Sequence, residues 1–218
     1  MKVADINSFP HPPRMKFADV AQQPPAYRRL LARSEARGFR MPSDVYIGTL
    51  LRALVAAKPA ARVLELGAGM GLSLAWLLDG LDADGTVISI DNDAGLVGEV
   101  RDELGGDERL ELVTGDGGAW LEAYAGPPFD LVFADTWPGK YHHLDEALAL
   151  VAPRGFYCVD DMREQPNWPE GHAAKAAALA GRLEREAGFA CVKLDWSTGV
   201  MLLTRMACAR ASPCRPTP

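Results

Sequence analysis

Glycines and a carboxylate recur in a pattern that can bind a nucleoside. An apolar run ends in Glu65, Gly67, Gly69 and Gly71 follow at alternate positions, and a second β-branched run closes at Asp91. We expect a strand, a glycine turn, a helix and a second strand, the order of a parallel βαβ unit. There the helix N-terminus offers free N–H groups, and an acidic residue about 20 positions further on binds ribose hydroxyls. The pattern predicts a nucleoside-containing ligand.

The spacing of the glycines distinguishes between classes of nucleoside-containing ligand. A dinucleotide fingerprint reads G-x-G-x-x-G, whereas this sequence reads E-x-G-x-G-x-G and has Leu at position 72. The spacing therefore disfavours an NAD(P)-dependent oxidoreductase. It resembles motif I of the class I S-adenosylmethionine (SAM) methyltransferases, in which the turn packs on the amino-acid end of SAM. The alternative interpretation is a glycine turn that only allows tight packing of strand on helix.

A third acidic position follows the next predicted strand, at residues 110–114. Asp116 comes just past this strand, within the sequence Gly-Asp-Gly. In a methyltransferase an acidic side chain here can accept a hydrogen bond from the adenine amino group. The alternative is an ordinary turn aspartate, because Asp-Gly is common in turns.

Three more carboxylates follow the ends of two later apolar runs. Asp135 comes after residues 129–134, and Asp160 and Asp161 come after residues 155–159. The carboxyl ends of parallel strands meet at one edge of the sheet. We therefore expect these side chains to converge, and hard divalent cations such as Mg²⁺ take oxygen ligands of this type.

Three longer segments carry a closer family resemblance. LELGAGMGLS, FDLVFADTWPGKY and GFYCVDDM resemble the metal-dependent O-methyltransferases related to catechol and caffeoyl-CoA O-methyltransferase. The resemblance implies SAM as cofactor, a small-molecule phenol or diol as acceptor, and a divalent ion held by Asp135, Asp160 and Asp161. Asp161 stands where the family has Asn. The cofactor-binding residues that it implies are Glu65, Gly67, Gly69, Gly71, Ser73, Asp91, Asp116 and Asp135.

The chain departs from this family at its catalytic base. The family's lysine lies three positions after the first metal-binding Asp, and this sequence has Pro138 there. Lys140, His142 or His143 can supply a base, and we expect the catalytic set to be Asp135, Lys140 and His142. A metal-bound hydroxyl can also ionise with less help, because the cation lowers its pKa. The alternative reading of Lys140 is a solvated loop lysine, and that of the two histidines is a pair of surface residues that open a helix.

The composition limits the function classes. The chain has 218 residues, 48% apolar content and a net charge of −6. These values suit one α/β domain and give no electrostatic reason to bind nucleic acid. No apolar run is long enough to span a membrane and no export signal is present, so we expect a cytoplasmic protein. Homo-oligomerisation is possible and cannot be read from the sequence.

The predicted elements define the domain that positions these residues. We expect an extended, proline-rich arm at 1–25, a single methyltransferase domain at 26–205 and a loose tail at 206–218. The fold class is α/β, with a Rossmann-like doubly wound seven-stranded sheet, mostly parallel with an antiparallel C-terminal hairpin strand. Helices are expected at 27–37, 44–57 (capped by Ser43), 95–104 and 173–187, and the C-terminal hairpin at 190–196 and 200–205.

Two function classes follow from these residues. The first is a SAM-dependent methyltransferase that transfers a methyl group to the oxygen of a small molecule. The second is a SAM-binding protein without turnover that acts in regulation or interaction, which Pro138 at the position of the base makes credible. A fold can host many functions, so the residues of the site must decide between them.

Overall fold

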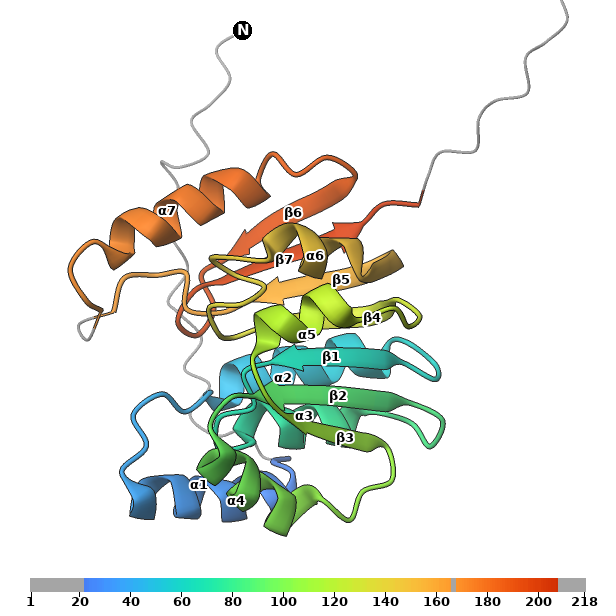
Figure 1. The fold of residues 1–218 in the computed structure, drawn as a ribbon, viewed down its shortest axis with the longest axis vertical. Coiled ribbons are helices and arrows are strands. Elements are labelled where there is room, and N and C mark those ends of the chain that lie inside the picture. The colour runs from blue at the N-terminus through green and yellow to red at the C-terminus, as the bar shows by residue number, and fades with distance from the viewer. Residues whose placement is uncertain (1–21, 166–167, 208–218) are drawn as a thin grey trace, which may run out of the picture.

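The computed structural model describes residues 22–165 and 168–207 of the chain (Figure 1). Most of the arm expected at 1–25, and most of the tail expected at 206–218, therefore lie outside the described residues. The helices are α1 Pro25–Arg37, α2 Val45–Ala56, α3 Leu72–Gly80, α4 Ala94–Leu104, α5 Gly117–Ala123, α6 Leu144–Ala149 and α7 His172–Leu183. The strands are β1 Arg62–Leu66, β2 Thr86–Asp91, β3 Leu110–Thr114, β4 Phe129–Ala134, β5 Val151–Val159, β6 Phe189–Leu194 and β7 Val200–Arg205.

The strands form a seven-stranded sheet in the order β3-β2-β1-β4-β5-β7-β6. The first five strands pair in parallel, and β7 pairs antiparallel with both β5 and β6. The order reverses between β1 and β4, so the ends of these strands flank a topological switch point, where α/β sheets bind ligands. The predicted fold class, with its antiparallel C-terminal hairpin, is confirmed.

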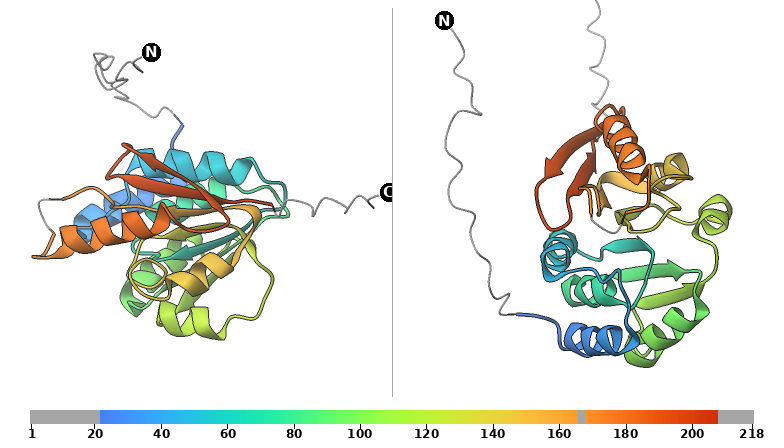
Figure 2. Two further views of the ribbon diagram at one scale, coloured as in Figure 1. Left: turned by 90° about the horizontal axis from the view of Figure 1, so that it is seen from above. Right: turned by 90° about the vertical axis from the view of Figure 1, so that its left-hand side faces the viewer.

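Two apolar layers cover the sheet because successive residues of each strand face opposite sides. Val63 of β1 packs with residues of α1 to α4, whereas Leu64 and Leu66 pack with residues of α5, α6 and α7. Figure 2 shows the two groups of helices on either side of the strands. Both faces of the central strands are buried, as the continuous apolar runs of β1 and β4 predict.

Several element boundaries differ from those expected. The N-cap of α2 is Asp44 and not Ser43, because the Asp44 carboxylate accepts the N–H groups of Tyr46 and Ile47. β5 begins at Val151, four residues before the expected start, and passes through Arg154 with a positive φ of 65°. α7 ends at Leu183, before the expected Ala187. Local caps and a strand irregularity, which apolar periodicity does not encode, account for these differences.

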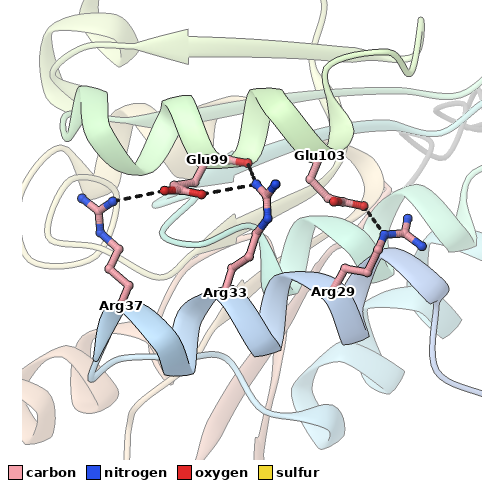
Figure 3. A network of polar contacts seen from close by, with 5 residues as sticks. All are labelled: Arg29, Arg33, Arg37, Glu99 and Glu103. Carbon is pink, nitrogen blue, oxygen red and sulfur yellow. Dashed lines mark hydrogen bonds and ion pairs between the residues drawn. The ribbon is translucent and has the colours of Figure 1, made fainter.

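A charged network joins α1 to α4 at one end of the sheet (Figure 3). Arg29, Arg33 and Arg37 recur every four residues and so lie along one face of α1. Arg29 pairs with Glu103, while Arg33 and Arg37 both reach Glu99, at 3.3 and 3.4 Å. Exposed pairs contribute only about 0.2–1 kcal/mol each, so the apolar packing of Leu30 in the core dominates the attachment of α1.

Within the described residues, no helix is both long enough and apolar enough to cross a membrane.

Candidate functional site

The glycine turn between β1 and α3 needs conformations that other residues rarely adopt. Gly67, Gly69 and Gly71 have φ values of 99°, 51° and 76°. A Cβ atom on Gly67 would lie 3.0 Å from the main-chain oxygen of Asp135 and 3.1 Å from Cβ of Thr136. The N–H groups of Gly67 and Ala68 both donate to the Ile90 carbonyl, which holds the turn against β2. The three glycines therefore let the turn lie close to both β2 and the end of β4.

Glu65 and Ser73 lie behind this turn, inside the fold. Glu65 is fully buried, and its carboxylate accepts hydrogen bonds from the Ser73 hydroxyl, at 2.6 Å, and from the Ser89 hydroxyl. Burial raises the pKa of Glu65 to about 7, although both serine hydrogen bonds oppose the change. Glu65 and Ser73, both predicted to bind the cofactor directly, thus form a hydrogen bond with each other on the inner side of the turn.

Asp91 ends β2 opposite the turn, at the place predicted for ribose recognition. Its Oδ2 atom accepts the N–H of Gly69 and its Oδ1 atom accepts the N–H of Asp93, both at 2.9 Å. A carboxylate oxygen has a second lone pair, so both oxygens can still accept a hydroxyl donor. The backbone contacts fix the rotamer of Asp91 and leave its outer side facing the cavity described next.

A cavity of about 310 Å³ opens between the ends of β1, β2 and β4. Its volume lies at the lower end of the range for small-ligand pockets. Both predicted nucleoside-binding carboxylates, Asp91 and Asp116, line it. The lining residues are Leu66, Gly67, Ile90, Asp91, Asn92, Gly115, Asp116, Gly117, Thr136, Trp137, Pro138 and His142. Asp116 also caps α5 through the N–H of Ala119, so the turn and the ligand-binding interpretations are compatible.

These features fit the nucleoside and amino-acid parts of SAM. Asp91 and Asp116, the carboxylates predicted for the ribose and the adenine, line one cavity together with Gly67 of the glycine turn. The free N–H groups at the N-terminus of α3 add partial positive charge beside the turn. Phe39 lies over the turn, since a Cβ on Gly69 would meet its ring at 3.4 Å.

Segment 38–44 also reaches the predicted acceptor end of the site. The Ser43 hydroxyl donates to Oδ2 of Asp135 at 3.3 Å, so Ser43 lies beside this carboxylate. Met41, two residues earlier, has 73% of its surface exposed. The segment therefore contacts the site through Phe39 and Ser43.

The carboxylates of Asp135, Asp160 and Asp161 lie close enough for their charges to interact. Burial raises the pKa of Asp135 well above its usual range, and the charges of Asp160 and Asp161 raise it further. Burial also raises the pKa of Asp160 to about 6. Oδ1 of Asp160 already accepts the hydroxyl of Thr198, at 2.6 Å, and the N–H of Asp161, at 2.8 Å. One oxygen of this predicted metal ligand is thus engaged by the protein.

The side chain of Lys140 is buried beside Asp160. Its side chain is only 5% exposed, and Nζ donates to the main-chain oxygen of Asp160 at 2.5 Å. The loop that carries it is held by Gly139, whose φ is 80° and whose carbonyl accepts the buried Tyr157 hydroxyl. The interpretation of Lys140 as a solvated loop residue is wrong.

The placement of these side chains does not fit a divalent ion. Within residues 22–165 and 168–207, no group of three or more His, Cys, Asp or Glu side chains is arranged to hold a metal. The Lys140 ammonium also lies against the main-chain oxygen of Asp160, and its charge acts on Asp135 and Asp160. The magnesium site built from Asp135, Asp160 and Asp161 stays a prediction from the sequence.

The two adjacent histidines lie elsewhere in the site. His142 lines the nucleoside cavity, and its Nδ1 atom lies 2.7 Å from Nδ1 of His143. Nε2 of His143 contacts Glu122 at 2.9 Å. The pair is therefore connected to α5, and the structure does not group His142 with the lysine and the carboxylates in the way that the predicted catalytic set requires.

His172, at the start of α7, is a candidate that sequence reasoning missed as a base. Its Nε2 atom lies 3.0 Å from the hydroxyl of Tyr141. Burial lowers the pKa of His172, the ammonium groups of Lys140 and Lys175 lower it further, and Asp161 opposes them. Thirty-one positions separate Tyr141 from His172 in the chain, so no local motif reveals the pair.

Four rings form what we call the aromatic cluster: Trp137, Tyr141, Trp168 and His172. The ring centroids of Trp137 and Tyr141 lie 5.5 Å apart, and those of Trp168 and His172 lie 4.5 Å apart. Trp137 is 48% exposed and also lines the nucleoside cavity. The cluster thus extends from that cavity to the start of α7, where Trp168 packs on the His172 ring.

The sheet order, the glycine turn and the carboxylates at strand ends agree with the comparisons with known proteins. Residues 64–162 match a family described as a methyltransferase domain, Methyltransf_24. This match supports the resemblance to the class I SAM-dependent methyltransferases seen in the sequence. SAM is the cofactor of this class.

Relatives of known name agree with the resemblance to methyltransferases. The chain is 35% identical over 138 residues to the catechol O-methyltransferase of Mycobacterium tuberculosis, a match that covers 60% of this chain and 63% of the relative. The structure of cofactor-bound Rv0187 from MTB has a TM-score of 0.75 at 25% identity, covering 87% of this chain and 93% of that one. The O-methyltransferase TomG of Streptomyces achromogenes, in complex with SAM, shares the fold, with a TM-score of 0.73 at 20% identity over 88% and 94% of the chains.

The chain spans 44–63% of the length of the curated relatives that it matches.

Proposed function

We propose that this protein transfers the methyl group of SAM to a hydroxyl oxygen of an aromatic small molecule. The observation that carries the proposal is the position of the aromatic cluster and Lys140 at the strand ends beside a cavity lined by Asp91 and Asp116. Methyl transfer needs mainly alignment of the two substrates, exclusion of water and removal of the acceptor proton. The residues of this edge can supply each of these.

The cofactor end of the site is formed by the glycine turn and the two carboxylates. Asp91, held by two backbone N–H groups, accepts the ribose hydroxyls. Asp116 and Gly117 hold the adenine, and the turn at Gly67 approaches the amino-acid end. When bound, SAM supplies the methyl group and keeps the electron pair of the broken S–C bond.

The acceptor end is formed by the aromatic cluster and Lys140. Planar acceptors stack on aromatic side chains, and such ring pairs contribute about 0.5–1.5 kcal/mol beyond buried area. Trp137 lies half exposed at this edge, with the Lys175 ammonium 4.7 Å from its ring centroid. This supports a phenol or a related aromatic alcohol as the acceptor.

His172 is the proposed proton acceptor for this reaction. A histidine whose pKa is lowered stays neutral near pH 7 and can take a proton. The acceptor hydroxyl passes its proton to the imidazole, and the oxygen lone pair forms the new O–C bond. This assignment replaces His142, whose ring lies in the nucleoside cavity.

Cofactor binding can be tested by thermal shift with SAM, S-adenosylhomocysteine (SAH) and NAD(H). A ligand at about 100 times its dissociation constant stabilises by about 2.7 kcal/mol and should raise the midpoint by about 5–11 °C. Stabilisation by NAD(H) alone would overturn the cofactor assignment.

Turnover can be tested with methyl-labelled SAM and a panel of phenols, aromatic amines and carboxylates. We expect label on hydroxyl oxygens of aromatic acceptors. Label confined to amines or carboxylates would contradict the O-methyl assignment, while SAM binding without transfer to any acceptor would favour a non-catalytic SAM-binding protein.

A further inference from the structure

A buried ammonium lies beside two of the carboxylates that the family resemblance assigns to a metal ion, Asp135 and Asp160. Lys140 is 5% exposed and donates from Nζ to the main-chain oxygen of Asp160. Its charge acts on both Asp135 and Asp160. A cation is therefore already present at this edge as part of the chain.

The loop after β4 holds this ammonium in place. Pro138 stands at the position of the family's lysine, and Lys140 follows two residues later. Gly139 takes a positive φ of 80° between them, and its carbonyl accepts the Tyr157 hydroxyl from β5. The Lys140 N–H also donates to the Trp137 carbonyl at 3.1 Å. The loop is closed on itself and tied to β5, so the lysine side chain is directed back over the strand end.

Two of the carboxylates beside this lysine already accept hydrogen bonds from the protein. Oδ1 of Asp160 is taken by Thr198 and by the N–H of Asp161. Oδ2 of Asp135 accepts the hydroxyl of Ser43. In the described part of the chain the acidic and histidine side chains form no group placed to bind a metal. A divalent ion brought here would be repelled by the ammonium group.

We propose that the Lys140 ammonium is the resident cation of this site, in place of a divalent metal, and that it binds the acceptor oxygen as that oxygen loses its proton. A lysine ammonium has three N–H donors, and one of them is used on Asp160. The remaining donors can hold a single phenolic oxygen, so the acceptor needs no second, chelating hydroxyl. The catalytic use of this cation rests on the proposed methyl transfer, whereas its exclusion of metal does not.

Metal binding tests the proposal without any turnover. Mn²⁺ is titrated into the full-length protein with saturating SAH, and free Mn²⁺ is followed by electron paramagnetic resonance. We expect no stoichiometric binding to the wild-type protein below about millimolar Mn²⁺, a concentration at the weak end for protein sites of hard cations. In Lys140→Met the repulsion is lost, and Mn²⁺ affinity should rise by at least about tenfold, as Coulomb's law gives with water-like screening.

Two further variants make the result specific. Lys140→Arg keeps the charge and should leave Mn²⁺ binding absent. Lys58→Met is the matched control, because Nζ of Lys58 also donates to a main-chain oxygen, that of Arg154 at 2.6 Å, and lies over the Phe156 ring, away from the carboxylates. It should behave as wild type. The midpoint shift with SAH checks that each variant is folded.

Activity gives a second, separate measurement. Methyl transfer by the wild-type protein should be the same in EDTA and in added Mg²⁺, whereas Lys140→Met should lose most of its kcat at unchanged SAH affinity. Tight Mn²⁺ binding by the wild type would overturn the proposal, and so would loss of activity in EDTA that Mg²⁺ restores. If Lys140→Met does not fold, the wild-type titration still decides. Absence of turnover on every acceptor would count against the proposed function and leave the metal result standing.

Discussion

The hydroxyl of Ser73, in the first turn of α3, donates a 2.6 Å hydrogen bond to the carboxylate of Glu65 on β1. The same carboxylate accepts the hydroxyl of Ser89, its register partner on β2. One buried side chain thus joins the three elements that form the glycine turn. Because a buried charge is costly, the protonation state of Glu65 should affect the stability of the whole unit.

The stability of the protein should fall as the pH rises, because Glu65 loses its proton. The pKa of this group is about 7 in the folded protein against an ordinary value of 4.5, so between these values the folded state holds a proton that the unfolded state has lost. The free energy of unfolding then decreases by up to about 1.4 kcal/mol per pH unit, about 3 kcal/mol in all. The contribution is fully present below pH 4.5 and is lost as the pH rises through 7.

Urea unfolding of wild type and Glu65→Gln at pH 5 and pH 8 measures this contribution. The variant should show a smaller loss of stability between the two conditions, because its amide does not titrate. Glu111→Gln, at an exposed position of β3, is the control and should follow wild type. Equal pH dependence in Glu65→Gln and wild type would show that the buried group does not titrate in this range.

The glycine turn should not tolerate a side chain at Gly67. Gly67→Ala places a Cβ 3.0 Å from the Asp135 carbonyl at a φ of 99°, which should cost at least about 1–3 kcal/mol of stability. Gly98→Ala is the matched control in α4, where a Cβ meets nothing within 4 Å. This change should instead stabilise by about 0.5–1 kcal/mol, because alanine is the better helix former. Thermal or urea unfolding of both variants distinguishes the two sites, and a neutral Gly67→Ala would contradict the close approach of turn and β4.

Asp91 should determine affinity for SAM. Asp91→Asn keeps the size of the side chain and removes its charge, and hydrogen bonds to charged groups contribute about 1.5–3 kcal/mol, or about 10- to 150-fold in Kd. Asp102→Asn, on the exposed surface of α4, should bind SAM as wild type does. Isothermal titration calorimetry with SAH checks both, and an unchanged Kd in Asp91→Asn would place the ribose elsewhere.

The sequence predicts the strand ends of this site better than its interior. Asp91, Asp116 and Asp135 lie where apolar runs stop, and the structure places each of them at the carboxyl edge of the sheet. Glu65 belongs to the glycine motif, but its side chain points into the layer that contains α3. In the sequence, only the alternation of side chains along the strand indicates this direction. The glycine spacing predicts the turn and gives no information about the rotamers beneath it.

Residues joined through a loop were harder to predict. The direction of Lys140 depends on the positive φ of Gly139 and on the Tyr157 hydroxyl from another strand. The contact between Tyr141 and His172 links the loop after β4 to the start of α7. Such contacts depend on tertiary packing across the sheet, which periodicity and spacing do not encode.

His172 should act on the acceptor and not on the cofactor. His172→Ala removes the imidazole that contacts the Tyr141 hydroxyl, and loss of a general base lowers turnover by about 10²- to 10⁴-fold. The pKa of His172 is lowered from 6.5, so in the wild type kcat/KM should fall only as the pH drops below that value, where the imidazole becomes protonated. The variant should lose this acid limb while its Kd for SAH stays unchanged. The control is Tyr124→Phe. The Tyr124 hydroxyl donates a hydrogen bond to the main-chain oxygen of Pro127 at the opposite edge of the sheet, so this variant should keep both the rate and the pH profile. A His172→Ala protein with wild-type kcat/KM and an intact acid limb would assign the proton acceptor to another group.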